Sequence, residues 1–361
     1  MTITAFVVHD GATAAGRTAW LAAWTAWPER EVFAHPDYVA LWAQQPGWRP
    51  MLACAHLDDV TVLHPFVFRD LRVEPLWDGT RGPAADLVSA YGYGGPFAWG
   101  PGSWETAASG FWTAFDSWAR DVGVVAEFVR RLPIPEALLP FPGELEVASV
   151  NVVRSLTPSL DEIWRDYEHK VRKNVARAER SGVSITEDET GTGLDAFLDL
   201  YHGTMKRVAA ADRYWLQRPF FERLHRALPG QFLYVHAWLE ERPVSTELVL
   251  VSARRTYSFL GGTRADAFGV RPNDLIKHHI IVWSKALGCD RFVLGGGYAP
   301  DDGIFRYKRS FAPRGLVNFY VGRRVLRPDL YVALSARAQR YRAASGLAAP
   351  PANFFPAYRD V

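Results

Sequence analysis

Hydrophobic residues recur along the chain in two patterns, one with helical spacing and one that alternates with polar residues, so the chain is expected to mix helices and strands. Helical spacing predicts helices at 18–27, 36–44, 159–182 and 193–209, and around the segment 111–118 and Trp283. Alternation and short apolar runs predict strands at 51–57, 60–69, 127–129, 150–156, 232–239, 243–252, 257–262, 291–294 and 304–311. Two pairs of these strands enclose short acidic turns, which is typical of hairpins.

Similar elements follow one another in both halves of the chain. A tryptophan precedes a glycine by five residues twice, as Trp118–Gly123 and Trp283–Gly288, and the two pairs are 165 residues apart. Each pair follows a tyrosine-rich segment with a Gly-Gly pair, YGYGG at 91–95 and YSFLGG at 257–262. The nearly constant offset predicts a tandem duplication of one sheet-and-helix unit, unless aromatic and glycine positions agree by chance.

The stretch 291–313 combines an apolar strand, three glycines, two acids and a lysine. Gly295–Gly297 remove every Cβ where the chain leaves the strand, so their N–H groups could face an anion or a carbonyl oxygen. After a turn at 301–303, the predicted strand 304–311 places Arg306, Lys308 and Ser310 on one face. A lysine facing a glycine loop suits a developing negative charge. The alternative is a surface hairpin with solvated cations.

The helix predicted at 159–182 has one apolar stripe and an otherwise basic surface. Ser159 and Glu162 form a capping-box pattern at its start, and Gly182 ends it. The basic residues are Arg165, Lys170, Arg172, Lys173, Arg177 and Arg180. Such a face either holds a nucleic-acid backbone by releasing counterions or is simply solvated.

Composition and charge separate the two halves. With 361 residues, of which 48% are hydrophobic, the chain is long enough for two domains. Residues 1–150 carry 9 basic and 17 acidic side chains, while the remainder carries 32 and 22 and all six lysines. A polyanionic partner is therefore expected to meet the second half. Cys54 and Cys289 are predicted to lie in the core, and no targeting or membrane-spanning segment is predicted, so the protein is expected to be cytoplasmic.

Several motifs of the second half resemble the Fem-type branch of the GNAT superfamily, whose members form peptide bonds with aminoacyl-tRNA. They are KVRKNVARAERSGV (170–183), YHGTMKR followed by RYW (201–207, 213–215), ELVL with YSFLGG, and GGGYAPDDGIFRYKRSF (295–311); SAYGYGGPF (89–97) gives a weaker match in the first half. The resemblance implies an α/β (α+β) fold of two tandem GNAT-like domains, each with a mixed, largely antiparallel sheet flanked by helices. These would span 1–148 and 149–324, with the tail 325–361 packing back on the first domain.

The resemblance also implies roles for particular residues. Lys308 matches the lysine proposed in the family to stabilise the acyl-transfer intermediate or to hold the substrate, and Tyr257 matches a strand tyrosine that is expected to act with it in catalysis. Arg207 and Tyr214 match further family positions and are expected to bind the substrate. Glu247, on a predicted strand, is a candidate to contact or deprotonate the acceptor amine, or else pairs with an arginine. Thr204, Asp302, Arg306 and Tyr91 are added as candidate substrate contacts, and Lys170, Arg172, Lys173, Arg177 and Arg180 as tRNA contacts.

Departures from the family pattern shape the expected function. The segment RADAFGVRPND (264–274) lacks the glycine-rich turn that binds coenzyme A pyrophosphate, and residues 1–150 contain no lysine to hold a uridine-diphosphate precursor. The expectation is an aminoacyl-tRNA-dependent transferase, a monomer without cofactor or metal, that acts on a small amine or short peptide in a specialised biosynthetic pathway, for example that of an antibiotic. The alternatives are an acyl-CoA-dependent N-acyltransferase that uses acetyl-CoA, a peptidoglycan interpeptide-bridge ligase, and a non-catalytic protein that keeps the fold.

Overall fold

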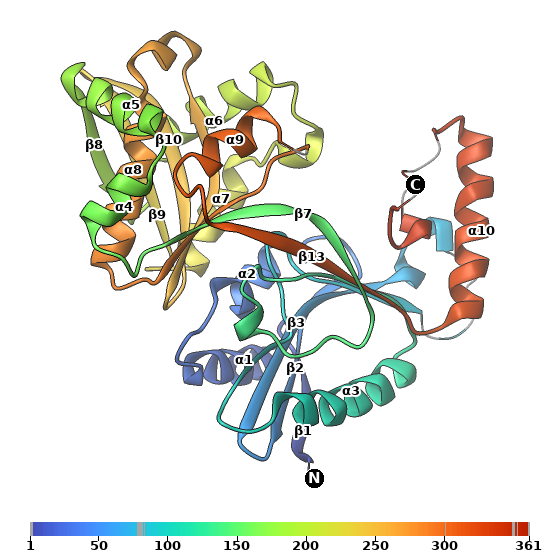
Figure 1. Ribbon diagram of the computed structural model, residues 1–361. Coiled ribbons are helices and arrows are strands. Elements are labelled where there is room, and N and C mark those ends of the chain that lie inside the picture. Colours follow the sequence, from blue (N-terminus) through green and yellow to red (C-terminus); the bar gives the residue numbers. More distant parts are fainter. Residues whose placement is uncertain are drawn as a thin grey trace. The chain divides into compact units, whose positions relative to one another are not determined.

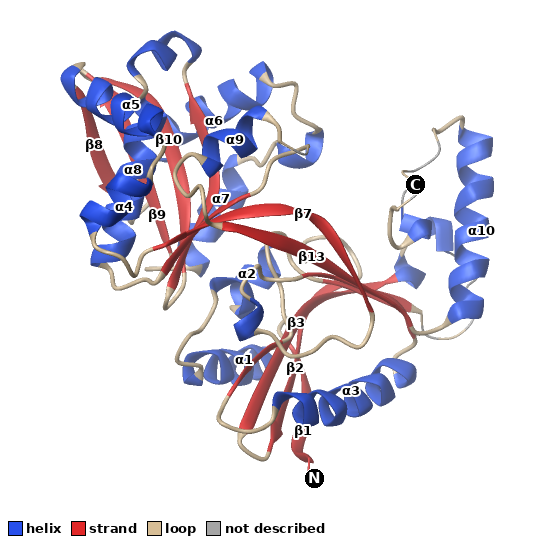
Figure 2. Ribbon diagram, in the orientation of Figure 1, coloured by secondary structure: helices blue, strands red, loops and turns tan. Residues whose placement is uncertain are grey.

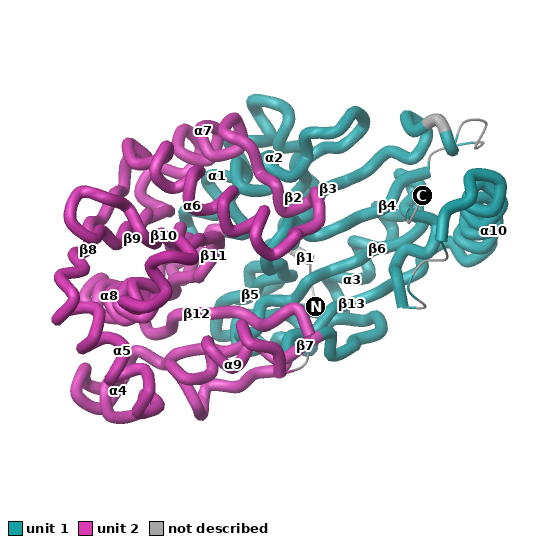
Figure 3. Tube along the Cα trace, turned by 90° about the horizontal axis from the view of Figure 1, so that it is seen from above, with its two compact units in different colours: residues 1–27, 33–148, 319–361 teal, residues 28–32, 149–318 magenta. Residues whose placement is uncertain are grey.

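The computed structural model describes residues 3–77, 82, 84–299, 301–348, 351 and 353–359. The chain forms two compact units (Figure 3), of which unit 1 comprises residues 1–27, 33–148 and 319–361, and unit 2 comprises residues 28–32 and 149–318. The short segment 28–32 is thus part of unit 2 although the residues on either side of it belong to unit 1. In the described part of the chain, no helix is both long enough and apolar enough to cross a bilayer.

Unit 1 is a sheet with helices against it (Figure 1). Its strands are β1 (Ile3–Asp10), β2 (Trp48–Leu57), β3 (Val60–Asp70), β4 (Ala85–Val88), β5 (Phe97–Trp99), β6 (Val124–Arg130) and most of β13 (Leu316–Val325). Its α-helices are α1 (Ala14–Ala26), α2 (Pro36–Leu41), α3 (Trp104–Asp121) and α10 (Pro328–Ser345). The predicted hairpin of the first half is confirmed, because β2 pairs with β3 in antiparallel register around the turn at Asp58 and Asp59.

Unit 2 is built in the same way from the second half of the chain. Its strands are part of β7 (Glu144–Ser155), β8 (Val183–Asp188), β9 (Phe232–Leu239), β10 (Arg242–Val251), β11 (Arg255–Thr263) and β12 (Arg291–Gly295). Its α-helices are α4 (Leu160–Asp166), α5 (His169–Arg180), α6 (Leu194–Arg207), α7 (Arg218–Ala227), α8 (Pro272–Ala286) and α9 (Gly303–Arg309).

The two units share one strand topology, as the predicted duplication requires. In unit 1 the order β1-β2-β3-β4-β6 has antiparallel neighbours until β4 and β6, which are parallel and joined through α3. In unit 2 the order β8-β9-β10-β11-β12 repeats this, with β11 and β12 parallel and joined through α8. Gly123 and Gly288, with φ of +75° and +84°, follow the ends of the two crossover helices, so the repeated glycine closes the same turn twice. The tyrosine segments are not equivalent, because 91–95 is a loop whereas 257–262 lies in β11.

Helices cover both faces of the unit 2 sheet (Figure 2), and strand alternation decides which residue meets which helix. Leu233, Val235 and Ala237 of β9 share a core cluster with α5 and α8. Tyr234, whose side chain points to the other face of the sheet, packs edge-on against Phe197 of α6 with ring centroids 4.9 Å apart. The predicted core positions Cys54 and Cys289 are buried free cysteines, each in its own unit.

The helix predicted at 159–182 is two helices, α4 and α5, with a break at Tyr167 and Glu168. Tyr167 is extended, with ψ of 145°, and Arg172 turns back to donate to the carbonyl oxygens of Arg165 and Tyr167. The sequence pattern did not indicate this break, because apolar residues continue at helical spacing across it and Ile163, Tyr167 and Val171 are all buried in the same core. The capping box of Ser159 and Glu162 is present as predicted.

The strand predicted at 304–311 is wrong: residues 303–309 form helix α9. The alternation of aromatic residues is equally compatible with one short helix, in which Tyr307 and Phe311 lie one turn apart with ring centroids 5.3 Å apart. Phe305 and Phe311 both join the core beside α8. Lys308 therefore projects from a helix and does not share a strand face with Arg306 and Ser310.

Candidate active site

Lys308 lies half-buried near the end of α9, facing the loop that follows β12. Its Nζ donates a hydrogen bond of 2.7 Å to the carbonyl oxygen of Gly296. The predicted proximity of this lysine to the glycine loop is therefore confirmed, although a carbonyl group meets it and not an N–H group. Among the described residues, this hydrogen bond is what holds the ammonium, and a reacting oxygen atom could share or replace it.

Asp302 occupies the centre of the loop before α9. It caps α9 by accepting from the Phe305 N–H at 2.7 Å, and it also accepts from the N–H groups of Tyr298 at 2.6 Å and Ala299 at 3.1 Å. Burial alone would raise the pKa of this carboxyl, but the three backbone donors outweigh it and lower the pKa. Gly297 must lack a Cβ here, because that atom would lie 2.4 Å from an Asp302 carboxylate oxygen. The structure thus gives Asp302 a role in shaping the loop.

Glu247 forms a buried ion pair that the sequence did not predict. The Nζ of Lys277, on α8, donates to both carboxylate oxygens of Glu247 at 2.5 and 2.6 Å and to the Ser258 hydroxyl at 3.0 Å. Glu247 stands opposite Val235 in the sheet register and so faces α8. Its carboxylate is neutralised inside the fold, and a direct role as the base that deprotonates the acceptor would require this pair to open.

The buried pair acts on Lys308 through its charge. Burial and the nearby Lys277 ammonium lower the pKa of Lys308 to about 8, while Glu247 and Asp302 oppose this effect. Lys308 therefore changes charge close to neutral pH, as a group that exchanges a proton or a hydrogen bond during a reaction needs to. Lys308, Lys277, Glu247 and Asp302 are the residues on which we centre the candidate site.

Lys277 was missed by the sequence interpretation, although a signal was present. It lies three and four residues before Ile280 and Ile281, which are buried, so helical spacing places it on the apolar face of α8. A lone lysine on an apolar helix face and a lone acid on a buried strand are each costly unless they meet. Matching these two buried, oppositely charged residues would have predicted the contact between Lys277 and Glu247.

Tyr257 lies away from this group. It precedes Ser258 on β11, so its side chain leaves the opposite face of the sheet, where its hydroxyl donates to Glu31 at 2.5 Å. Arg255 binds the same carboxylate at 2.6 Å. The tyrosine is 1% exposed. The structure places Tyr257 in a buried network and not beside Lys308.

Arg207 and Thr204 lie on α6, which covers the face of the unit 2 sheet opposite to α8. Arg207 donates to the Thr263 carbonyl at 3.0 Å and to the Thr204 hydroxyl at 3.2 Å, and its guanidinium stacks 5.1 Å from the Phe268 ring centre. Arg207 borders a cavity of about 380 Å³ whose wall also includes Arg264 and two acidic residues. This cavity is a suitable place for a small charged substrate.

Tyr214, which follows α6 in the chain, contacts the glycine loop through an aromatic pair. Its ring lies 6.1 Å from the ring of Tyr298, whose N–H binds Asp302. Arg306 is exposed and donates to the Asp301 carbonyl at 2.5 Å. Tyr91 belongs to unit 1, where its ring packs 5.0 Å from that of Trp42. The structure therefore brings Tyr214 toward Asp302 and leaves Arg306 at the surface.

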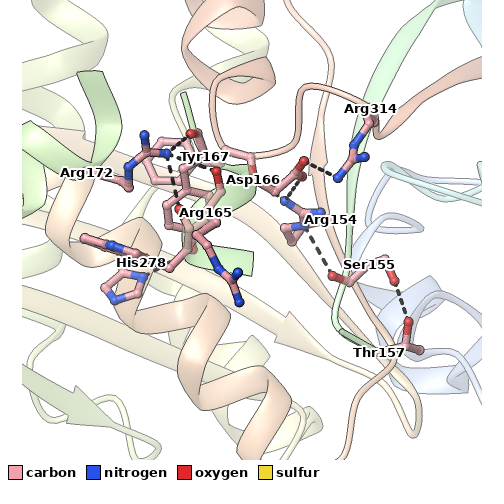
Figure 4. Close-up of polar contacts among 11 residues, drawn as sticks. Arg154, Ser155, Thr157, Arg165, Asp166, Tyr167, Arg172, His278 and Arg314 are labelled. Atoms are coloured by element: carbon pink, nitrogen blue, oxygen red, sulfur yellow. Dashed lines mark hydrogen bonds and ion pairs between the residues drawn. The ribbon is translucent and has the colours of Figure 1, made fainter. Parts of the chain in front are cut away.

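Helix α5 presents most of the predicted RNA contacts on one exposed face. Lys170, Lys173, Arg177 and Arg180 are exposed and recur at intervals of three and four residues, opposite the buried Val171, Val175 and Ala178. Arg172 differs, because Figure 4 shows its guanidinium bound to backbone oxygens of the α4–α5 turn. Lys173, Arg177 and Arg180 are thus available to a polyanion, and Lys170 becomes available when it leaves its exposed ion pair with Glu168, 3.1 Å away.

Known proteins resemble this chain in sequence. The sequence model of the acetyltransferase (GNAT) domain family matches residues 165–309. A UDP-N-acetylmuramoylpentapeptide-lysine N(6)-alanyltransferase from Weissella viridescens is 26% identical over 198 residues, which cover 51% of this chain and 56% of that protein. The chain thus matches little more than half the length of this relative.

Solved structures share the fold. The crystal structure of FemX matches with a TM-score of 0.65 and 13% identity, covering 88% of this chain and 98% of that one. The C-terminal domain of a putative lysylphosphatidylglycerol synthetase from Agrobacterium fabrum matches with a TM-score of 0.51 and 13% identity, covering 84% of this chain and 91% of that one. The predicted fold class, a mixed α/β fold of the GNAT type, is confirmed.

Proposed function

We propose, from the premise that this chain is a Fem-like member of the GNAT superfamily, that it transfers an aminoacyl group from charged tRNA to an amine and so forms an amide bond. The observation that carries the proposal is the Lys308 ammonium, half-buried beside the Gly296 carbonyl and next to a second buried lysine. A half-buried lysine whose pKa is lowered toward neutrality is typical of a group that takes part in a reaction.

The residues fit the charges that aminoacyl transfer creates. A neutral amine attacks the ester carbonyl, a C–N bond forms and the carbonyl oxygen becomes negative. The C–O bond to the ribose then breaks, and the proton lost by the amine is balanced by the one that the departing ribose oxygen takes up. Lys308 supplies a donor for that oxygen by exchanging its bond to Gly296. The exposed cations of α5 supply the surface that holds the tRNA backbone. No bound cofactor is needed in this scheme, since tRNA is a co-substrate.

The acceptor we favour is a small amine or short peptide of a specialised pathway. The cavity beside Arg207 offers both arginine and carboxylate side chains, which suits a zwitterionic molecule of that size. A second candidate acceptor is a peptidoglycan precursor, and the similarity to the alanyltransferase named above is the observation that favours it. The absence of lysine from residues 1–150 favours the first.

An acyl-CoA donor is the alternative that the chain's own geometry makes less attractive. The segment before α8 is a short 3₁₀ helix at Ala265–Val270 followed by Arg271 with φ of +60° and Pro272. A glycine-rich turn with several free N–H groups, which would hold a pyrophosphate, does not occur in this described segment.

The experiment that tests the proposal incubates the protein with pooled aminoacyl-tRNAs and candidate amines and identifies products by mass spectrometry. We expect a product heavier than the amine by one aminoacyl residue, absent after ribonuclease treatment and strongly reduced in Lys308→Met. Lys285→Met is a matched control, since Lys285 binds the Leu156 carbonyl and lies outside the candidate site. Acylation from acetyl-CoA alone, or turnover unchanged in Lys308→Met, would contradict the proposal.

A further inference from the structure

A second cavity in unit 2, of about 500 Å³, lies where the end of β7, helix α4 and the chain after α9 come together. Three arginines line it, Arg154, Arg165 and Arg314, together with the carboxylates of Glu162 and Asp166. None of these residues belongs to the Lys308 group or to the five positions of α5 that are predicted to contact tRNA, although Arg165 is one of the basic residues of the helix predicted at 159–182. Their concentration around one hollow therefore calls for a ligand of its own.

Arg154 and Arg314 are held by one carboxylate (Figure 4). Arg154 Nη1 lies 2.7 Å from Asp166 Oδ2 and Arg314 Nη2 lies 2.5 Å from Asp166 Oδ1. Arg154 also donates to the Phe311 carbonyl at 2.9 Å and is only 7% exposed. Burial alone would raise the pKa of Asp166, but the two guanidinium groups outweigh it and lower the pKa. The pair of arginines is thus fixed in place by a single negative charge.

Donor capacity remains after these contacts are counted. The Arg314 side chain is 84% exposed, and its contact with Asp166 is made through Nη2. Arg165 is exposed, and its Nε donates to the Asp161 carbonyl at 3.1 Å, so its terminal nitrogens can bind a ligand. Glu162 turns its carboxylate to the Ser159 N–H and hydroxyl as part of the capping box. The cavity therefore has a net positive charge with guanidinium groups at its mouth.

We propose that this cavity binds a phosphate group through Arg314 and Arg165, with Arg154 as the buried arginine behind them. Guanidinium groups match phosphate oxygens in pairs, and three of them around one hollow suit a tetrahedral anion better than a single carboxylate. Helix α5, with its exposed row of cations, begins three residues after Asp166. In a step that rests on the proposed function, the ligand is a backbone phosphate of the RNA carrier, which the α5 cations continue to hold.

The cavity itself is tested with a small probe that does not depend on RNA. We measure the binding of inorganic tripolyphosphate by calorimetry to the wild-type protein and to Arg314→Ala, Arg165→Ala and Arg226→Ala. Arg226 is an exposed arginine of α7 that does not line the cavity, so it controls for loss of surface charge. We expect the first two changes to weaken binding about tenfold and the third to leave it unchanged. Equal affinity in all four proteins overturns the site.

Deacylated tRNA then tests the identity of the ligand. In the wild type, the logarithm of the association constant should fall linearly with the logarithm of salt concentration, and Arg314→Ala should reduce the slope by about one. A slope that Arg314→Ala leaves unchanged, while tripolyphosphate binding is weakened, refutes the RNA assignment and retains the phosphate site. Absence of tRNA binding by the wild type refutes the proposed function, and the tripolyphosphate result still decides the cavity.

Discussion

The charge of Lys308 is the residue property with the most direct consequence for the proposed reaction. Its pKa is lowered to about 8 by burial and by Lys277, so it is protonated below that pH and neutral above it. If the ammonium stabilises the negative oxygen, kcat should fall as pH rises through about 8. In Lys277→Met, one repelling charge is gone and the Glu247 carboxylate is uncompensated, so the pKa should rise and the falling limb should move to higher pH.

The measurement is the pH profile of kcat, with Lys285→Met as the control because Lys285 lies on the same helix without touching Glu247. A profile that moves equally in both variants would trace the shift to loss of net charge. A profile that rises through pH 8 in the wild type would instead make neutral Lys308 the active form, acting as a base.

The Lys277–Glu247 pair should also matter for stability. Removing one partner of a buried ion pair leaves an uncompensated charge, so Lys277→Met should lower the free energy of unfolding by about 3–5 kcal/mol. Lys277→Met combined with Glu247→Gln removes both charges and should recover part of the loss. Urea denaturation of the three proteins measures this, and a double variant less stable than the single one would show that the pair itself contributes little.

Sequence reasoning singled out side chains that had a distinctive local context. Asp302 precedes a glycine in a turn and Lys308 follows in a family motif, so both were named as candidates, and the structure places both beside the glycine loop. Lys277 was missed because its meaning depends on Glu247, thirty positions earlier, and no local pattern joins them. The Tyr257 side chain was predicted to act beside Lys308, but strand alternation sends it to the other face of the sheet.

At the level of elements, long periodic segments were predictable and short ones were not. Hairpins β2–β3 and β9–β10 were predicted because each alternates over many residues. Helix α9 was not, because seven residues contain barely two turns and its aromatic spacing suits either structure. What determines α9 is its cap: the Asp302 carboxylate holds three N–H groups and fixes where the helix begins.

Replacing that cap should therefore separate helix stability from chemistry. Asp302→Ala should cost about 0.5–2 kcal/mol of stability and should lower kcat further than stability explains, because Lys308 lies two turns beyond the cap. Asp302→Asn keeps a capping oxygen and should retain much of both. Denaturation midpoints and single-turnover rates give the comparison, and equal activity in the alanine variant and the wild type would refute a positioning role for the cap.

Helix α5 carries basic residues of two kinds, exposed ones and one that binds the backbone of the α4–α5 turn. Lys173→Ala with Arg177→Ala removes exposed charge and should lower the salt dependence of tRNA binding by about two, with little change in stability. Arg172→Ala should lower the stability and leave the salt dependence of tRNA binding nearly unchanged, because Arg172 donates hydrogen bonds to backbone oxygens of the α4–α5 turn. Fluorescence anisotropy at several salt concentrations and thermal unfolding distinguish them, and a large slope change in Arg172→Ala would contradict this division.

On the scale of the whole molecule, the chain is not divided at a single point. Residues 28–32 of the first half belong to unit 2, and residues 319–361 of the second half belong to unit 1. Composition and repeats predicted two modules, and both units do show the same strand order. Sequence alone gave no sign that 28–32 enters unit 2, because the contacts that hold it there, foremost those of one acidic side chain, are made to residues more than 200 positions away.

That side chain is Glu31, which is fully buried within unit 2. Its two oxygens bind Arg255 at 2.6 Å and the Tyr257 hydroxyl at 2.5 Å. Burial lowers the pKa of Arg255, but the Glu31 and Glu29 carboxylates more than offset it and raise the pKa. The segment 28–32 therefore supplies the main counter-charge to a buried guanidinium on β11.

Glu31→Ala should destabilise unit 2 and leave unit 1 largely intact. The loss should be about 3–5 kcal/mol, because Arg255 is only 3% exposed and keeps just the half-exposed Glu29 as a charge partner. Hydrogen exchange followed by mass spectrometry should show faster exchange in β11 and β12, next to Arg255, while β2 and β3 of unit 1 keep their protection. Glu29→Ala is the matched control, since it removes an exposed carboxylate from the same guanidinium. Equal loss of protection in β2 and β11 would mean that the two units unfold as one.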